Sequence, residues 1–148
     1  GVPVQTLTAA ELRSIYKRDT QFWSNGDPIR PFALPPESSL RQAFDLAVLG
    51  MDPQTATKYW IDQRVRGGAP PPRGVPSVAL RARVITSLTG AIAYLPQSAV
   101  PQGVRVVAMI RGGSVTRAMA AAPFMADARF STLVPSMHAS VVASLGGP

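Results

Sequence analysis

The chain of 148 residues contains no cysteine and a single histidine, His138. The absence of cysteine excludes disulfide bridges, thiolate metal ligands and cysteine nucleophiles. One histidine excludes every metal or catalytic site that takes two imidazoles from the same chain. The acidic residues show no spacing typical of a metal cage or of paired acid–base catalysis, so we expect no metal and no cofactor.

Acidic residues are scarce, and their distribution along the chain is uneven. Fifteen lysines and arginines stand against eight aspartates and glutamates, which gives a formal net charge of +7. Residues 1–63 carry a net charge of −1, residues 64–102 contain five arginines and no acid, and residues 103–148 carry +3. The basic residues form no long run and are not interleaved with aromatics, as a nucleic-acid footprint would require. We therefore expect an acidic protein or envelope component as partner, and no nucleic acid.

Long apolar runs are also missing. No stretch reaches the roughly 18 to 20 apolar residues of a membrane span, because arginines interrupt the apolar segments of the last third. We predict no membrane span. The chain opens at Gly1-Val2-Pro3 without a methionine, which we interpret as the start of an exported chain whose signal peptide has been removed. The expected location is periplasmic or extracellular.

The residues that are present support one core built from short elements. Apolar residues make up 46% of the chain, and 15 prolines and 12 glycines favour many turns. Residues 7–18 predict a helix, because Thr8 and Glu11 have the spacing of a capping box. Its apolar residues share one face and are predicted to enter the core: Leu12, Ile15 and Tyr16.

A turn and a strand follow this helix. The sequence Asn-Gly-Asp-Pro at residues 25–28 is typical of a turn, and Asp27 is interpreted as a turn former. Residues 29–34 predict a short strand at the edge of a sheet, since Pro31 has no backbone donor. Trp23, just before the turn, is predicted to pack in the core.

Two more helices are marked by their caps. Ser38 or Ser39 begins the first, which is predicted to run to about Leu49 and to end at Gly50. Asp52, followed by a proline, begins the second. The apolar face of this second helix is formed by Ala56, Tyr59 and Trp60.

The pattern is weaker toward the end of the chain. Residues 67–76 predict a loop, residues 77–87 a helix, and residues 91–95 and 104–110 buried strands. Beyond them we predict a short helix over 114–122 and strands over 130–134 and 140–145. We expect one domain over residues 1–111 and a C-terminal extension over residues 112–148, which docks on the same or a neighbouring chain because it is too short for a core of its own.

The order of these segments resembles a known family. The sequences LTAAELRSIY, FWSNGDPIRPFALPPESSLRQAF, LGMDPQTATKYW and TGAIAYLP follow one another within residues 4–96. Together they are similar to the phosphate-type periplasmic substrate-binding proteins of ABC transporters, and most of all to short, single-lobe relatives. The resemblance implies an α/β fold, a single lobe of a type 2 periplasmic-binding-protein-like fold with a mixed sheet flanked by helices.

The resemblance also implies an anion site. In the family a serine-rich helix N-terminus binds the phosphate oxyanion, and the matching residues here are Ser38 and Ser39, with Arg41 one turn further. Backbone N–H groups, the helix dipole and the guanidinium fork would all favour an anion there. Glu37 and Leu40 depart from the family, where a small residue and a threonine are usual. The alternative is that the two serines only cap the helix.

The sequence offers no convincing catalytic constellation. It has no Walker loop, no dinucleotide fingerprint and no nucleophile elbow. Ser136, His138 and Asp127 would be the candidates for a hydrolase, but they lie in a weakly patterned stretch. We predict that the protein is not an enzyme.

Two functions remain open. The first is an exported, non-enzymatic domain that serves as a structural or accessory subunit of an envelope or extracellular assembly, with a protein partner or self-assembly through the extension. The alternative is a single-lobe binding module for phosphate or a similar small oxyanion, linked to ABC-type uptake. The departures at Glu37 and Leu40 and the length for only one lobe favour the first.

Overall fold

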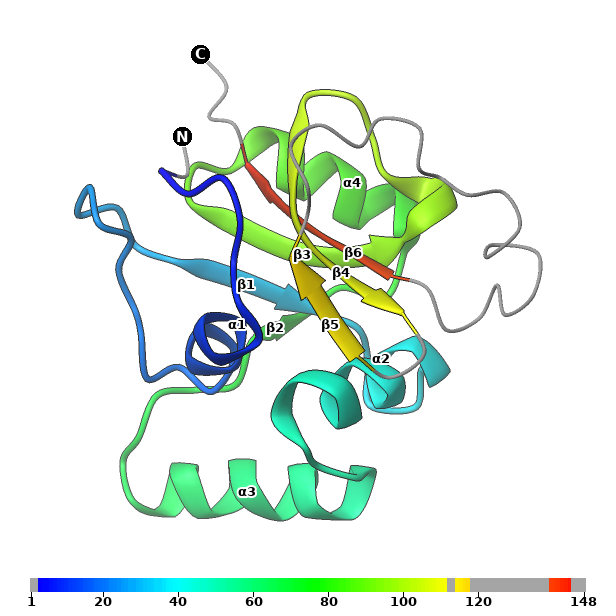
Figure 1. Cartoon of the computed structure of the whole chain (residues 1–148). Helices are drawn as coiled ribbons and strands as arrows, with labels where there is room; N and C mark the ends of the chain where they lie inside the picture. Colours follow the sequence, from blue (N-terminus) through cyan, green and yellow to red (C-terminus); the bar gives the residue numbers. More distant parts are fainter. Residues whose placement is uncertain (1–2, 112–113, 118–138, 145–148) are drawn as a thin grey trace.

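The computed structural model describes residues 3–111, 114–117 and 139–144. Its centre is a six-stranded mixed sheet in the order β2-β1-β3-β6-β4-β5, flanked by helices (Figure 1). The strands are β1 (Arg30–Ala33), β2 (Arg73–Gly74), β3 (Ala91–Pro96), β4 (Val104–Arg111), β5 (Ser114–Arg117) and β6 (Ala139–Ser144). The helices are α1 (Ala9–Tyr16), α2 (Ser39–Phe44), the π-helix η1 (Asp45–Leu49), α3 (Pro53–Val65), α4 (Val78–Ser87) and the 3-10 helix η2 (Gln97–Ala99). The predicted α/β class, a mixed sheet flanked by helices, is confirmed.

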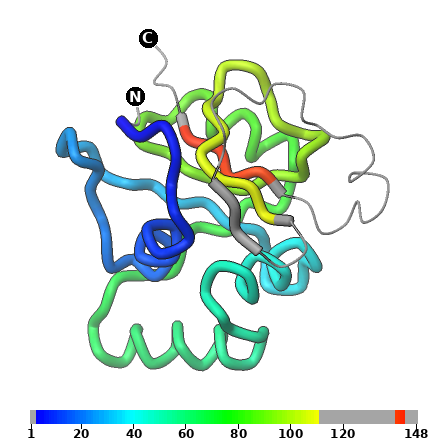
Figure 2. Tube along the Cα trace, viewed as in Figure 1, coloured from blue at the N-terminus to red at the C-terminus, as the bar shows by residue number. Residues whose placement is uncertain are grey.

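Strand β6 occupies the middle of the sheet. Strands β1, β2 and β3 are parallel to one another, whereas β6 runs antiparallel to β3 on one side and to β4 on the other. Ala93 of β3 stands opposite Val142, and Met109 of β4 stands opposite Ser140. The strand predicted over 140–145 is thus confirmed. Residues 139–144, from the predicted C-terminal extension, build an interior strand of the same sheet as residues 30–111 (Figure 2).

Both faces of the sheet are buried. In β3, Ile92 and Tyr94 belong to the core cluster under α1, α2 and η1, whereas Ala93 and Leu95 belong to the cluster on the side of α4. A run of consecutive buried residues is typical of a strand that is covered on both sides. The predicted buried strand over 91–95 is therefore confirmed, and its unbroken apolar sequence has a physical reason.

Helix α1 forms as its sequence predicts. The Thr8 hydroxyl accepts the Glu11 N–H at 3.2 Å, and the Glu11 carboxylate accepts the Thr8 N–H at the same distance. The Tyr16 hydroxyl donates to the carbonyl oxygen of Phe32 at 3.0 Å, which ties the end of α1 to β1. The residues predicted for the core are all buried: Leu12, Ile15 and Tyr16.

Three aromatic side chains form the centre of the cluster beneath α1. Phe44 stacks on Tyr94 with a centroid distance of 3.9 Å and meets Tyr16 edge-on at 4.7 Å. The Tyr94 hydroxyl accepts the backbone N–H of Leu34 at 3.0 Å. Burial raises the pKa of Tyr16 and of Tyr94 well above the ordinary tyrosine value, so both hydroxyls keep their protons. These contacts join α1, α2, β1 and β3 into one unit.

Strand β1 is not at the edge of the sheet, so that prediction is wrong. It lies between β2 and β3. The two-residue strand β2 pairs only with Phe32 and Ala33, so Pro31, which has no N–H to donate, lies just beyond the end of β2. A short neighbour therefore accommodates a proline in an interior strand.

The helix predicted over 114–122 is wrong for its first four residues. Residues 114–117 form β5, which pairs with β4 so that Ile110 stands opposite Val115. Two signals favoured this hairpin: β-branched residues at 115 and 116, and the Gly-Gly dipeptide at 112–113. The rest of that predicted helix, and the strand predicted over 130–134, lie outside the described residues.

The other predicted caps are present. Gly50 ends the helical run at φ 67°, a left-handed conformation that glycine adopts without strain. The Asp52 carboxylate accepts the Thr55 N–H at 2.7 Å. At the start of the helix predicted over 77–87, the Ser77 hydroxyl accepts the Leu80 N–H at 3.2 Å and caps α4. In the part of the chain that the structure describes, no helix is long and apolar enough to cross a membrane.

Candidate functional site

The residues predicted for an anion site lie together at the start of α2. The Ser38 hydroxyl accepts the backbone N–H of Arg41 at 3.3 Å and is the N-cap of the helix. Ser39, the first residue of α2, is exposed, as is Glu37. Ser38 thus has the capping role that the alternative assigned to it.

Arg41 has partners within the chain. Its Nε lies 3.0 Å from Oδ2 of Asp45, one helical turn further, and its Nη1 donates to the carbonyl oxygen of Leu34 at 2.7 Å. Both side chains of the ion pair are largely buried. The guanidinium therefore holds η1 and the end of β1 against α2, and two of its nitrogens are engaged there.

The electrostatics of this ion pair are set by burial. Burial raises the pKa of the Asp45 carboxyl above its ordinary value, and the charge and hydrogen bond of Arg41 offset part of that rise. Desolvation thus outweighs the attraction between the two charges. The pair contributes no net charge to the surface beside it.

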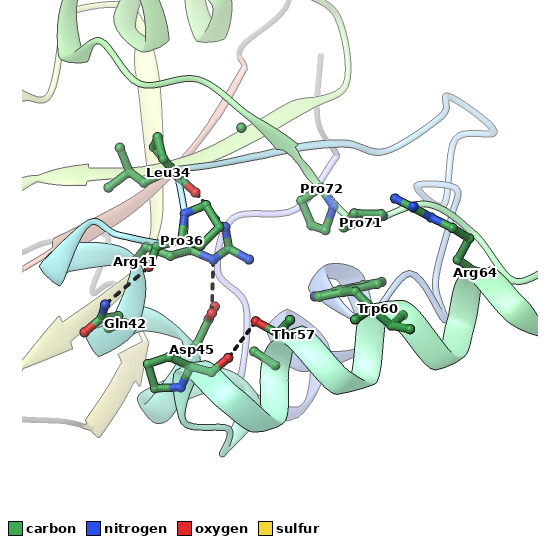
Figure 3. A pocket seen from close by; sticks show the side chains of 15 residues that line it. Leu34, Pro36, Arg41, Gln42, Asp45, Thr57, Trp60, Arg64, Pro71 and Pro72 are labelled. Atoms are coloured by element: carbon green, nitrogen blue, oxygen red, sulfur yellow. Dashed lines mark hydrogen bonds and ion pairs between the residues drawn. The ribbon is translucent and has the colours of Figure 1, made fainter.

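A groove with a volume of about 380 Å³ opens next to the ion pair, between α2, α3 and the loop that leads to β2 (Figure 3). This volume is within the range of ligand pockets, about 300–1,000 Å³. Its walls are mainly prolines and other apolar residues, together with a few polar groups. They are Leu34, Pro35, Pro36, Arg41, Gln42, Asp45, Pro53, Ala56, Thr57, Trp60, Ile61, Arg64, Pro71, Pro72 and Gly74.

The two ends of the groove differ in charge. Arg41 and Asp45 lie at one end, and Trp60 faces the proline-rich loop at the other, where Arg64 reaches the rim (Figure 3). Of the described residues that line the groove, Asp45 alone carries a carboxylate. Among the described residues, the Arg64 guanidinium has no hydrogen-bond or ion-pair partner. Its charge is therefore available to a ligand.

Helix α3 forms one wall of the groove and is only loosely attached to the rest of the fold. Of its 13 residues only Ala56 is buried, whereas Ile61 is 57% exposed and Val65 81% exposed. Tyr59 and Trp60, predicted for its apolar face, are half-buried and meet edge-on at 4.9 Å. The Lys17 ammonium lies 5.2 Å from the centre of the Tyr59 ring, a cation–π contact between α1 and α3.

Trp23 and Asp27 have the structural roles that the sequence predicts. The buried indole of Trp23 donates to the carbonyl oxygen of Gly90 at 3.0 Å, and the backbone N–H of Asp27 donates to the Asn25 side chain at 3.0 Å. Gly90 has a φ of 78°, and a Cβ there would clash with the carbonyl oxygen of Pro28. These contacts fasten the turn to the start of β3.

In the sequence, Arg81 is one of the five arginines of residues 64–102, and nothing there distinguishes it from an exposed residue. In the structure its side chain is only 1% exposed. Its Nη1 donates to the carbonyl oxygen of Val75 at 2.9 Å, and its Nε has no hydrogen-bond partner among the residues that the structure describes. Burial lowers the pKa of this guanidinium, and the nearby hydroxyls of Tyr94 and Tyr16 counteract the shift. Arg81 therefore belongs to the interior and not to the surface that meets a partner.

The described residues form no metal site and do not include the candidate hydrolase residues. Over residues 3–111, 114–117 and 139–144, no three acidic, histidine or cysteine side chains come together to hold a metal ion. The hydrolase candidates Asp127, Ser136 and His138 lie outside those ranges. The groove beside α3 combines apolar walls with a buried ion pair and the exposed guanidinium of Arg64, and we take it as the candidate site.

Comparison with protein-family models, with curated proteins and with solved structures gives no match.

Proposed function

We propose that this chain is a non-enzymatic lobe of the type 2 periplasmic-binding-protein kind, related to the phosphate-type proteins, and that it serves as an accessory subunit of an exported or envelope assembly. It binds another protein through α3. The observation that carries the proposal is the exposure of Ile61 and Val65 on a helix that is capped and 13 residues long. A helix that buries one residue of 13 contributes little to the core, so a contact outside the chain explains its apolar side chains.

The charge around α3 selects the kind of partner. Lys58, Arg64 and Arg66 lie on the helix or at its C-cap, and they outnumber the acids there, which are Asp62 on the helix and Asp52 at its N-cap. A second copy of the chain would bring like charges together, which opposes association. We therefore expect a different protein, which presents an apolar strip bordered by aspartates or glutamates.

Capture of a small oxyanion is the less supported function. The guanidinium of Arg41, which would have to grip the anion, already binds Asp45 and the carbonyl oxygen of Leu34. Isothermal titration with phosphate should give no heat at millimolar ligand. A saturable heat that disappears in Arg41→Ala would restore the oxyanion function.

Site-specific cross-linking tests the protein-binding function. The photoreactive residue p-benzoylphenylalanine would replace Val65 in the full chain, in cells that produce it natively, with Arg83 as the control position. Arg83 is also exposed but lies on α4, which covers the other face of the sheet. Irradiation should yield a discrete adduct from position 65 that contains a different protein, and none from position 83. No adduct, equal adducts from both positions, or an adduct between two copies would overturn the proposal.

A further inference from the structure

We infer that the groove between α3 and the proline-rich loop receives an extended segment of the partner, with an apolar side chain against Trp60 and an acidic side chain paired with Arg64. The inference rests on the proposed function only in taking the ligand to be part of a protein. It specifies the place on this chain where the partner binds and the side chains that the bound segment must carry.

The groove has rigid walls. One-third of its lining residues are prolines from three separate segments: Pro35, Pro36, Pro53, Pro71 and Pro72. Proline fixes its own φ, so these walls lose little freedom when a ligand binds. Trp60 faces Pro71 and Pro72 across the space (Figure 3). An aromatic ring between prolines is an apolar platform that suits an aliphatic, aromatic or proline side chain.

The unpaired charge lies at one end only. Arg41 and Asp45 neutralise each other at the other end, so that end attracts neither sign strongly. Arg64 is exposed at the rim and pairs with no described residue. A guanidinium presents a planar fork that matches a carboxylate. The occupant should therefore place its carboxylate beside Arg64 and its apolar part deeper, against Trp60.

The apolar surface continues beyond the groove, which favours a polypeptide over a small ligand. Ile61 lines the groove, and Val65 follows it one turn later on the same side of α3. A small molecule that filled the groove would leave Val65 exposed. An extended segment can occupy the groove and still cover this end of α3.

A displayed library of random 12-residue peptides, selected on the full chain, tests this inference. Selected peptides should carry aspartate or glutamate next to an apolar residue, and titration followed by tryptophan fluorescence gives their affinities. Arg64→Glu should weaken binding by about tenfold or more, because it reverses the charge that pairs with the peptide. The matched control Arg83→Glu makes the same charge change on α4 and should leave the affinity within about twofold.

Three results would overturn the inference: no enriched sequence, enriched peptides without acidic residues, or equal loss of affinity in both variants. Circular dichroism of both variants shows whether each keeps its fold. The cross-linking experiment separates this inference from the proposed function. A cross-link from position 65 together with peptides indifferent to Arg64→Glu rejects the groove as the entry point and leaves the protein-binding function intact.

Discussion

Helices α1 and α3 start in similar ways and end up in different environments. The Thr8 hydroxyl caps α1 and the Asp52 carboxylate caps α3, each by accepting a backbone N–H three residues later. Yet α1 buries three of its eight residues, whereas α3 buries one of 13. Caps decide where a helix begins, and the apolar face decides what the helix packs against. In this molecule α1 packs into the core, whereas α3 lies on the surface and contacts the core through few residues.

The contacts between the two helices show how that support works. Lys17, the C-cap of α1, lies over the ring of Tyr59 on α3. A cation–π contact at the protein surface is worth only about 0.5–1 kcal/mol. Because an isolated helix of about 12–15 residues is marginal in water, α3 depends on such contacts and on its cap. It can therefore open locally without the core unfolding.

The largest expected effect on stability comes from removing a strand of the core. A chain that ends at residue 138 lacks β6, whose residues Val141 and Val142 are completely buried between β3 and β4. Two interior strands then lose their pairing partner, so we expect no cooperative unfolding transition in urea. A sharp transition with an unchanged denaturant dependence would show that residues 139–148 are dispensable for the fold.

Truncation of single side chains compares the two regions directly. Phe44→Ala removes the ring that stacks on Tyr94 and should lower the free energy of unfolding by about 3–5 kcal/mol. The control Val65→Ala, on α3, should change it by no more than about 0.5 kcal/mol. Urea denaturation measures both. Similar losses for the two variants would mean that α3 packs as part of the core.

A smaller, pH-dependent effect is expected at the ion pair beside the groove. Burial raises the pKa of Asp45 in the folded chain above the ordinary aspartate value of 3.8, so the native state holds this proton more tightly than the unfolded state. The contribution of Asp45 to stability is therefore largest below that ordinary value, and is lost as the pH rises through the raised pKa.

Comparison with Asp45→Asn, which cannot ionise, isolates this contribution. The free energy of unfolding of the wild type minus that of the variant should fall as the pH increases from about 3 to 7, because aspartate ionises near 4 in the unfolded chain. Urea denaturation at each pH gives the two values. A difference that rises with pH would show that the attraction of Arg41 outweighs burial.

Local features were predictable from the sequence. The capping box of Thr8 and the left-handed Gly50 depend on residues close together in the chain, and the structure contains both. The buried strand over 91–95 was equally clear, because its apolar run has no interruption. The pairing of Arg41 with Asp45 was readable as well, since the two are four residues apart on a predicted helix. This spacing favours an ion pair within the helix over an anion as the partner of Arg41.

Features that depend on distant residues were not predictable in the same way. The burial of Arg81 requires α4, the segment at Val75 and the sheet to meet around it, and nothing in its own segment distinguishes it from an exposed arginine. The central place of β6 depends on pairing with β3 and β4, at least 28 positions away. The groove is formed by three segments that are separated in the sequence, so its walls could not be assembled without the fold.

Amide hydrogen exchange of the isolated chain tests most directly whether α3 is a surface and not part of the core. Helix α1 provides the internal reference, because it lies in the same molecule and packs against the core through three buried side chains. We expect the hydrogen-bonded amides of α3 to exchange at least about tenfold faster than those of α1, through local opening. Equal protection of the two helices, set by global unfolding, would contradict this expectation.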